Sequence, residues 1–224
     1  MKHAGQARRA ALKLVFWAWL GAVLLGCCTM VAHFLPAKVF GAAAFLWVLF
    51  VVFTLYFFRD PTAQTPAAHG LVVSPGHGKV DVVDDLDDAP FIGGPCHRIS
   101  IFLSILDVHV QNAPVSGTVN RLVHTPGKYV SALRADSALY NENVLIVFDS
   151  SEVIGEKIGL RLIAGVLARR IVPFVKEGDE VARGERVSLI QFGSRCDLYL
   201  PLRYEIRIKP GDKVAGGETI VAAR

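Results

Sequence analysis

Acidic residues are absent from the first 58 positions of this 224-residue chain, although the whole chain contains 20 of them. Two runs in that region, residues 14–35 and 39–58, have no charged side chain at all. As a helix, each run is long enough to cross about 30 Å of hydrocarbon. The sequence therefore predicts a basic N-terminus over residues 1–13 and a two-helix transmembrane hairpin over residues 14–58.

The basic residues of this region predict the orientation of the hairpin. Four of them precede the first apolar run, and only Lys38 lies between the two runs. Because positively charged flanks stay in the cytoplasm, we expect the N-terminus and everything after residue 58 to lie on the cytoplasmic side of the inner membrane. A cleaved signal peptide is the alternative, but the first run exceeds the usual apolar length of about 7 to 15 residues, and no A-x-A site follows it.

Motifs of several large protein classes are missing as well. The chain has no P-loop, no G-x-G-x-x-G, no H-E-x-x-H and no G-x-S-x-G. Its four cysteines form no C-x-x-C pair, so we expect neither a disulfide framework nor a metal site. After residue 58 the acidic side chains outnumber the basic ones by one, and a nearly neutral domain without a basic stripe excludes nucleic acid as the partner.

Short β-prone runs separated by glycine and proline fill the chain from residue 71 onward. Runs of about 4 to 8 residues with frequent turn signals are typical of β-rich domains. One helical segment is expected near residues 131–143, and the acidic stretch at residues 84–88 is expected to be a loop. The predicted fold of residues 59–224 is a β-dominated α+β domain, because strands do not alternate with helices as in a doubly wound fold.

An internal repeat refines this fold. The segments 175–186 (VKEGDEVARGER) and 208–219 (IKPGDKVAGGET) share G-D-x-V-x-x-G-E, and SPGHGKV and APVSGTV share P-x-x-G-x-V. Such turn-plus-strand units resemble the lipoyl-like barrel-sandwich core of carrier domains. We therefore expect strands at 172–176 and 205–209 to be equivalent. A carrier function is disfavoured, because the segment between the repeats has no modifiable lysine at a hairpin tip.

Seven sequence blocks occur in an informative order. They are FFRDP (57–61), SPGHGKV (74–80), RISIFLSILDVHVQNAPVSG (98–117), NEN (141–143), IAGVLARRI (163–171), GER (184–186) and QFGSRCDLYLP (191–201). In this order the chain resembles the short, membrane-anchored bacterial form of phosphatidylserine decarboxylase. The resemblance implies an enzyme that converts phosphatidylserine to phosphatidylethanolamine through a Schiff base to a pyruvoyl group.

The resemblance also implies the origin of that cofactor. In the family, the serine of a Gly-Ser pair attacks the preceding carbonyl, and elimination and hydrolysis leave a pyruvoyl group on the new N-terminus. Here the pair is Gly193-Ser194, so cleavage gives a β chain of residues 1–193 and an α chain of residues 194–224. The pyruvoyl group is needed because no ordinary side chain delocalises the carbanion that decarboxylation leaves. The implied partners are membrane phosphatidylserine and the two processed chains, and a homo-oligomer is left open.

Two histidines are candidates for proton transfer. His109, in LDVHVQNAP, matches the family's histidine block and is expected to act in processing, in decarboxylation or in both. His77 stands where most relatives have the aspartate of SPADGKV. Either His77 accepts the proton itself, or an acid such as Asp107 or Asp81 supplies the charge, or processing is slow or absent. The last alternative describes a non-catalytic homologue that binds lipid or has a structural role.

Five further residues are candidates for binding the substrate. Arg169 and Arg170 offer guanidinium groups to the serine carboxylate or the lipid phosphate. The family block Asn141, Glu142 and Asn143 is expected to line the site or to stabilise a turn.

Overall fold

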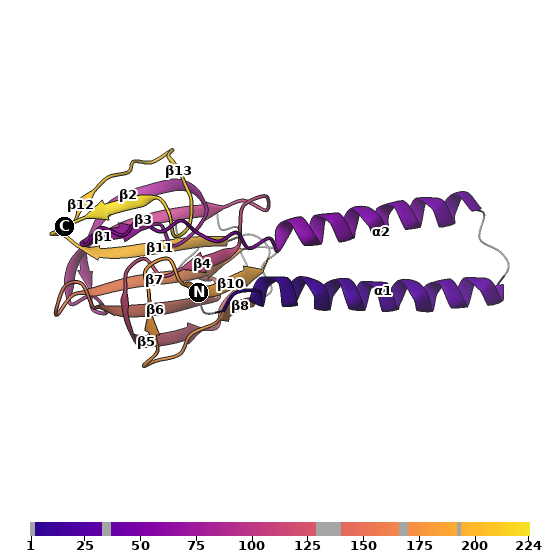
Figure 1. The fold of residues 1–224 in the computed structure, drawn as a ribbon, viewed down its shortest axis with the longest axis horizontal. Coiled ribbons are helices and arrows are strands. Elements are labelled where there is room, and N and C mark those ends of the chain that lie inside the picture. The colour runs from indigo at the N-terminus through magenta and orange to yellow at the C-terminus, as the bar shows by residue number, and fades with distance from the viewer. Residues whose placement is uncertain (1–2, 33–36, 129–139, 166–169, 192–193) are drawn as a thin grey trace. The chain divides into compact units, whose positions relative to one another are not determined.

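A computed structural model describes residues 3–32, 37–128, 140–165, 170–191 and 194–224 (Figure 1). Residues Ala4 to Asp60 form one compact unit, and the chain from Pro61 to Arg224 belongs to a second. The first unit contains two helices, α1 (Gln6–Ala32) and α2 (Ala37–Phe57). The second unit is rich in strands, and the candidate site lies within it.

Apolar side chains of the helical unit point outward. Trp17 is 66% exposed and Phe45 is 63% exposed, which suits contact with lipid better than contact with water. Among the described residues, one helix is long and apolar enough to cross a membrane, over Gln6–Cys27, and the apolar part of α2, Gly41–Phe57, is shorter. Helix α1 begins before the first apolar run because the Ala, Arg and Lys residues that precede the run are good helix formers.

The second unit contains three sheets. The large sheet has the strand order β13-β2-β3-β11-β7-β6-β5-β9, and the two small sheets have the orders β1-β14-β12 and β4-β10-β8. The strand bounds are β1 (Leu71–Val73), β2 (Gly78–Ala89), β3 (Gly94–Leu103), β4 (Val110–Asn112), β5 (Gly117–Thr125), β6 (Asn143–Ser150), β7 (Lys157–Ala164), β8 (Arg170–Pro173), β9 (Glu180–Val181), β10 (Arg186–Gln191), β11 (Ser194–Pro201), β12 (Glu205–Ile206), β13 (Lys213–Val214) and β14 (Ile220–Ala223).

The core lies on one face of the large sheet. Alternate residues of β7 (Ile158, Leu160 and Leu162) and of β11 (Cys196, Leu198 and Leu200) are fully buried. Their period of two places these residues on one face of the sheet, and the other face of β11 is buried as well, at Arg195, Asp197 and Tyr199. The β-dominated prediction is therefore confirmed for the described residues. Most of the helix expected near 131–143 lies outside them, and β6 begins at Asn143.

Two halves of the domain are related by an internal pseudo-twofold symmetry. The split half comprises residues 71–103 and 194–224, and the continuous half comprises residues 110–191. The order of the large sheet reads the same from both ends if β13, β2, β3 and β11 correspond to β9, β5, β6 and β7. The two small sheets correspond in the same way. The continuous half is thus inserted between β3 and β11 of the split half.

Backbone hydrogen bonds confirm the repeats. Gly178 N–H donates to the Val119 carbonyl and Gly211 N–H to the Val80 carbonyl, each at 2.8 Å. At the P-x-x-G turns each half donates a backbone hydrogen bond to the other. Val73 N–H donates to the Pro114 carbonyl (3.0 Å), and Asn112 N–H donates to the Pro75 carbonyl (2.8 Å). The expected strand pair is also found at equivalent positions, since β8 pairs with β10 as β12 pairs with β14. A lipoyl-like core remains a prediction.

The glycine of each P-x-x-G motif has a steric reason. A Cβ on Gly78 would lie 2.1 Å from the Phe102 carbonyl oxygen, and a Cβ on Gly117 would lie 2.1 Å from the Asp149 carbonyl oxygen. Real Cβ atoms do not approach a carbonyl so closely, so only glycine allows the first residue of β2 or β5 to pack against its neighbour strand.

The predicted acidic loop is wrong. Residues 84–88 belong to β2, which pairs with β3 as far as Ala89. Cross-strand partners explain the difference, because Asp84 accepts two hydrogen bonds from Arg98 and Asp85 lies 2.5 Å from the His97 ring. The Arg98–Asp84 ion pair and the His97–Asp85 hydrogen bond across the two strands stabilise the pairing that the acidic sequence alone disfavours.

Candidate active site

The predicted cleavage position lies at the start of the central strand of the large sheet. Ser194 is the first residue of β11 and is in register with Leu103 of β3 on one side and Ala164 of β7 on the other. Gly193 lies outside the described residues. Because two ladders hold the backbone of β11, the residue at its start has a fixed position relative to the ends of β3 and β7.

His109 reaches this end of the sheet through the segment that follows Leu103. The ring is 1% exposed, and its Nδ1 lies 2.9 Å from the Asp107 carbonyl oxygen. A carbonyl oxygen only accepts, so Nδ1 carries the proton in the neutral ring and Nε2 is the basic nitrogen. The His109 carbonyl accepts from the Ile190 amide at 3.0 Å. His109 is therefore bonded to β10, the strand that leads to Ser194.

His77 lies in the turn before β2 and is half-buried. A Cβ added to Gly216 would lie 3.0 Å from Cδ2 of the His77 ring and 2.9 Å from Oδ1 of Asn112. His77 and Asn112 thus meet beside a glycine that leaves room for both. Gly78, the next residue, opens β2, which pairs with β3, and β3 in turn pairs with β11. We call the region of Ser194, His77, His109 and Asn112 the serine end.

Both acids that were expected to assist the histidines have other partners in the structure. The Asp107 carboxylate accepts from the Ser104 amide (2.8 Å) and hydroxyl (2.7 Å), so it closes the turn after β3. The Asp81 carboxylate is paired with Arg195. Each of these carboxylates therefore has a partner of its own, and the part that either acid plays at a histidine stays a prediction.

Arg195 is a residue that sequence reasoning missed. It follows Ser194 directly, is 2% exposed and forms an ion pair with Asp81 of β2, two strands away. Losing Asp81 would leave a buried guanidinium without its charge partner, which is costly. The pair therefore fixes the start of β11 in the sheet. No local sequence signal predicts it, because the partners are 114 residues apart.

The family block at residues 141–143 lies beside the same strand end. The Asn141 side-chain amide donates to the Ala164 carbonyl at 2.7 Å, and Ala164 is the register partner of Ser194. The Asn143 side chain donates to the Asn141 carbonyl at 3.0 Å. Glu142 lies 3.1 Å from the ring of His124. The block therefore stabilises the ends of β6 and β7, and it lies next to the candidate site.

The structure describes one of the two arginines that were expected to bind the substrate. Arg170 is exposed and in register with Gln191 at the end of β10. Its strand places it near the chain that leads to Ser194. Arg169 lies outside the described residues. No cluster of three or more His, Cys, Asp or Glu side chains that suits a metal ion occurs in the described part of the chain.

Burial controls the ionisation of two groups on β11. Burial raises the pKa of the Cys196 thiol well above its usual range, and the neighbouring Asp197 carboxylate raises it further. Burial also raises the pKa of Asp197, against the opposing effects of a Ser100 hydrogen bond and nearby arginines. Cys96 and Cys196 are both buried free thiols.

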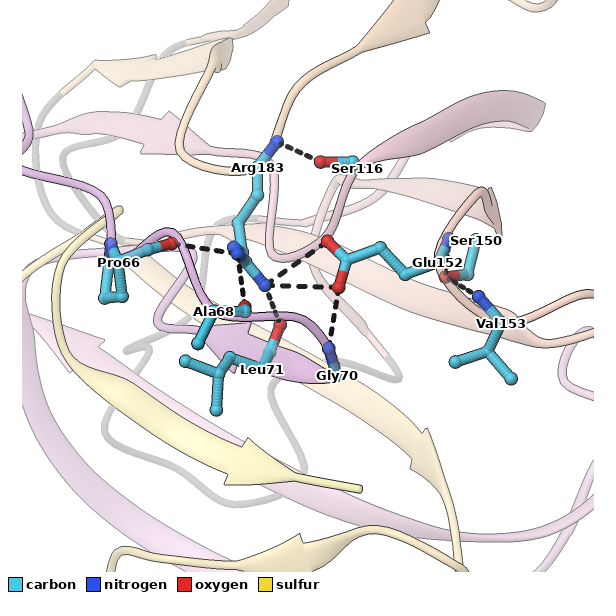
Figure 2. Close-up of polar contacts among 9 residues, drawn as sticks. All are labelled: Pro66, Ala68, Gly70, Leu71, Ser116, Ser150, Glu152, Val153 and Arg183. Atoms are coloured by element: carbon cyan, nitrogen blue, oxygen red, sulfur yellow. Dashed lines mark hydrogen bonds and ion pairs between the residues drawn. The ribbon is translucent and has the colours of Figure 1, made fainter.

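The pseudo-twofold symmetry relates the serine end to a second region, which we call the arginine end (Arg183, Glu152 and Glu156). Figure 2 shows Arg183 between the segment before β1 and Glu152. Its guanidinium donates to the carbonyls of Pro66, Ala68 and Leu71 and lies 3.3 Å from a Glu152 oxygen. Glu156, which precedes β7, is 2% exposed and contacts Arg224 at 2.7 Å.

The repeats align the residues of the two ends one by one. Arg183 corresponds to Gly216, and Ser116, whose hydroxyl accepts from the Arg183 amide at 3.0 Å, corresponds to His77. A large charged side chain at one end is thus replaced by a glycine at the other, and the hydroxyl is replaced by an imidazole.

Comparisons with known proteins agree with this arrangement. The sequence profile of the phosphatidylserine decarboxylase family matches residues 50–222, a span that contains the Gly193-Ser194 pair. This chain belongs to the phosphatidylserine decarboxylase family. The assignment confirms the family resemblance that the seven sequence blocks indicated.

Relatives within the family cover most of the chain. A phosphatidylserine decarboxylase proenzyme of Desulfotalea psychrophila is 44% identical over 79% of this chain and 82% of its own length. One of Symbiobacterium thermophilum is 35% identical over 96% of both chains. A third, of Novosphingobium aromaticivorans, is 42% identical over 75% of this chain and 71% of its own length. The family likeness therefore extends over the strand-rich unit and, in one relative, over nearly the whole sequence.

Proposed function

We propose that this chain is a self-processing decarboxylase that converts phosphatidylserine to phosphatidylethanolamine. The observation that carries the proposal is the family match across residues 50–222, which includes Gly193-Ser194. The position of Ser194 supports it, because the start of β11 is fixed by β3, by β7 and by the Arg195–Asp81 pair.

Processing begins with the hydroxyl of Ser194. Its oxygen adds to the Gly193 carbonyl carbon, the C–N bond between the two residues breaks, and the proton lost by the hydroxyl moves to the released amine. Loss of the Ser194 Cα proton and cleavage of its Cβ–O bond then release the Gly193 carboxylate. Water finally replaces the nitrogen, which leaves as ammonia. The products are residues 1–193 and a chain of residues 194–224 that begins with a pyruvoyl group.

His109 is our candidate for the proton transfers. Its Nδ1 is held by the Asp107 carbonyl, which leaves Nε2 as the basic nitrogen of a buried ring. A base in this tautomer is able to take a hydroxyl or Cα proton and to return it later. His77 is the second candidate, because it occupies the turn beside β2 and has space next to Gly216.

The residues at the serine end fit a pyruvoyl group. The group is built from Ser194 itself, so it needs no separate binding cradle, and the Asp81 carboxylate that reaches this strand end is neutralised by its ion pair with Arg195. A pyruvoyl group supplies the carbonyl that withdraws electrons from the substrate while carbon dioxide leaves. Arg170 and the Arg169 that precedes it are the proposed partners of the anionic headgroup. Asn141, Glu142 and Asn143 are proposed to shape the wall of the site.

The helical unit supplies the reason for a membrane location. We propose that residues 14–58 form a two-helix anchor in the inner membrane, with the catalytic domain of residues 59–224 in the cytoplasm. The apolar surface of α1 and α2 and the basic residues before them support this. An anchored domain acts on a lipid headgroup without removing the acyl chains from the bilayer.

The test is the intact mass of the purified full-length chain under denaturing conditions. We expect two fragments that divide between Gly193 and Ser194, the smaller one lighter by one ammonia than a simple hydrolysis product. The Ser194→Ala variant should give a single chain of 24.3 kDa. The control is Ser151→Ala, at an exposed serine of the β6–β7 connection, which should be cleaved like the parent protein.

A second readout separates the alternatives. Phosphatidylethanolamine should form from phosphatidylserine in mixed micelles with the cleaved protein and not with the Ser194→Ala variant. A parent chain that stays at full mass and forms no product would establish the other candidate, an unprocessed homologue. His77 in place of an aspartate is the feature that would explain such a result.

A further inference from the structure

A partly open cavity lies on the outer face of the large sheet, next to the block of residues 141–143. It has a volume of about 420 Å³ and lies between β5, β6, β7 and the tip of the β2–β3 hairpin. Its lining includes Arg121, Arg161, Thr125, Asn143 and Phe91. Two arginines therefore line one partly open cavity, with a hydroxyl, an amide and an aromatic ring beside them.

Neither arginine is neutralised by an ion pair with another described side chain. Arg121 projects from β5 and is exposed, and Arg161 projects from β7, two strands away. The nearest acid in the sheet ladder is Asp197, the register partner of Arg161 on β11. Asp197 is buried and does not line the cavity; burial raises its pKa, against the opposing charges of Arg161 and other nearby arginines. Asp197 thus offsets part of the charge of Arg161, whereas no ion pair among the described residues neutralises Arg121.

Aromatic rings hold Arg161 in place. Its Cζ lies 5.7 Å from the centre of the Phe91 ring and 5.7 Å from the centre of the Tyr199 ring. Its Nε is buried without a hydrogen-bond partner. A guanidinium fixed between rings loses little freedom when a ligand binds, and the surrounding apolar walls strengthen its attraction for an anion.

We propose that this cavity binds a phosphate ester of glycerol-like size. The planar forks of Arg121 and Arg161 match the oxygens of a phosphate group, and Thr125 and Asn143 offer polar groups for its hydroxyls. Phe91 supplies an apolar wall for the carbon skeleton. A soluble phosphate ester and the headgroup of an anionic phospholipid share this chemistry, and the experiment distinguishes the two sources.

The cavity is connected to the catalytic machinery through one strand. Asn143, in the cavity wall, donates to the Asn141 carbonyl, and Asn141 donates to the carbonyl of Ala164, the register partner of Ser194. Two hydrogen bonds therefore separate the cavity from the strand position that faces Ser194. The proposal itself concerns binding and holds whether or not the chain is processed.

The experiment is a calorimetric titration of the full-length chain in neutral detergent with sn-glycerol 3-phosphate. We expect saturable binding that weakens at least about tenfold in Arg121→Gln and in Arg161→Gln, because each loses a hydrogen-bonded charge partner. Arg161→Lys, which keeps the charge, should retain part of the affinity. The control is Arg207→Gln, an exposed arginine 4.0 Å from Glu205, and it should bind like the parent protein.

A second arm identifies the source of the phosphate. The titration is repeated in nanodiscs of phosphatidylcholine with and without phosphatidylglycerol. If phosphatidylglycerol displaces the soluble probe, the ligand is a lipid headgroup, and if it does not, the ligand is a soluble ester. The proposal is overturned if the parent protein binds no probe, or if Arg207→Gln weakens binding as much as the two cavity variants. The same titration on Ser194→Ala keeps this result independent of processing.

Discussion

At the arginine end of the domain, Arg183 and Ser116 occupy the positions that Gly216 and His77 occupy at the serine end. The backbone bonds around the two pairs are nearly the same. The connections differ, because a short turn joins β6 to β7 at the arginine end, whereas the whole continuous half separates β3 from β11 at the serine end.

The comparison shows how the same backbone arrangement serves two purposes. At the arginine end the buried guanidinium of Arg183 donates to three carbonyls and pairs with the Glu152 carboxylate, which stabilises the region. At the serine end the equivalent position is Gly216, which has no side chain, and the half-buried imidazole of His77 lies next to it. Removing a structural side chain from one copy of a repeat leaves space in which a titratable group is able to work.

The largest effect is expected at the serine end itself, from His109→Gln. If the ring acts as the base, cleavage or turnover should fall about 10²- to 10⁴-fold, the usual contribution of a positioned proton-transfer group. Cleavage is followed by intact mass and turnover by phosphatidylethanolamine formation, so the two roles are measured separately. The control, His97→Gln, removes a ring paired with Asp85 in the β2–β3 hairpin. Parental rates of both steps in His109→Gln would remove the histidine from the mechanism.

The arginine end should respond in stability and not in chemistry. Arg183→Met keeps the alkyl chain but leaves Glu152 without its charge partner, which should cost about 3 to 5 kcal/mol of unfolding free energy. Urea unfolding is measured in the Ser194→Ala background, so that every molecule is uncut. Arg207→Met, at an exposed pair, should change the unfolding free energy by less than about 1 kcal/mol. An equal loss in the two variants would contradict the structural role of Arg183.

A methyl group at Gly216 tests the space that separates the two ends. In Gly216→Ala the new Cβ approaches Asn112 Oδ1 at 2.9 Å and His77 Cδ2 at 3.0 Å, so both side chains must move. If His77 takes part in processing, we expect cleavage to slow by about tenfold, because small misplacements of reacting groups are costly. Gly155→Ala, with a positive φ but open space in the β6–β7 turn, should lower stability and leave cleavage unchanged. Equal cleavage rates in both variants would show that His77 is a bystander.

The smallest effect concerns the thiol of Cys196, whose Sγ would lie 2.9 Å from a Cβ on Gly76 at the serine end. Burial raises its pKa, so the reactive thiolate is scarce at about pH 8, where a free cysteine is partly ionised. Iodoacetamide should therefore leave the Cys196 peptide unmodified in the native protein and modify it fully in urea. Native modification would mean that the serine end opens far more than the arginine end.

Sequence reasoning predicted the elements that depend on local pattern. Alternating apolar residues gave most strands, the G-D-x-V and P-x-x-G frames gave the internal repeat, and seven ordered blocks gave the family. The acidic strand was missed, because Asp84 is stabilised by Arg98, a partner from a different strand. Helix α1 begins at Gln6, before the apolar run, because an apolar run marks a membrane segment and not the start of a helix.

The candidate site was predicted in part for the same reason. Ser194, His109 and the 141–143 block carry local motifs, and the structure brings them to neighbouring strand ends. The Arg195–Asp81 pair and the space at Gly216 depend on contacts between distant segments, which no single motif encodes. Asp107, which was expected to help a histidine, also accepts hydrogen bonds from Ser104 within its own turn, and its part at the histidine stays a prediction.

The insertion of one half into the other has a consequence for chain connectivity. The bond between Gly193 and Ser194 is the covalent link by which the inserted half returns to β11, and β11 is bordered on both sides by strands of the longer fragment. The short fragment also contributes β12, β13 and β14, which pair into two sheets. A cut there releases little conformational entropy, since both new ends stay tethered by ladders. The two fragments would remain one folding unit, held together by strand pairing within two sheets and not by a peptide bond.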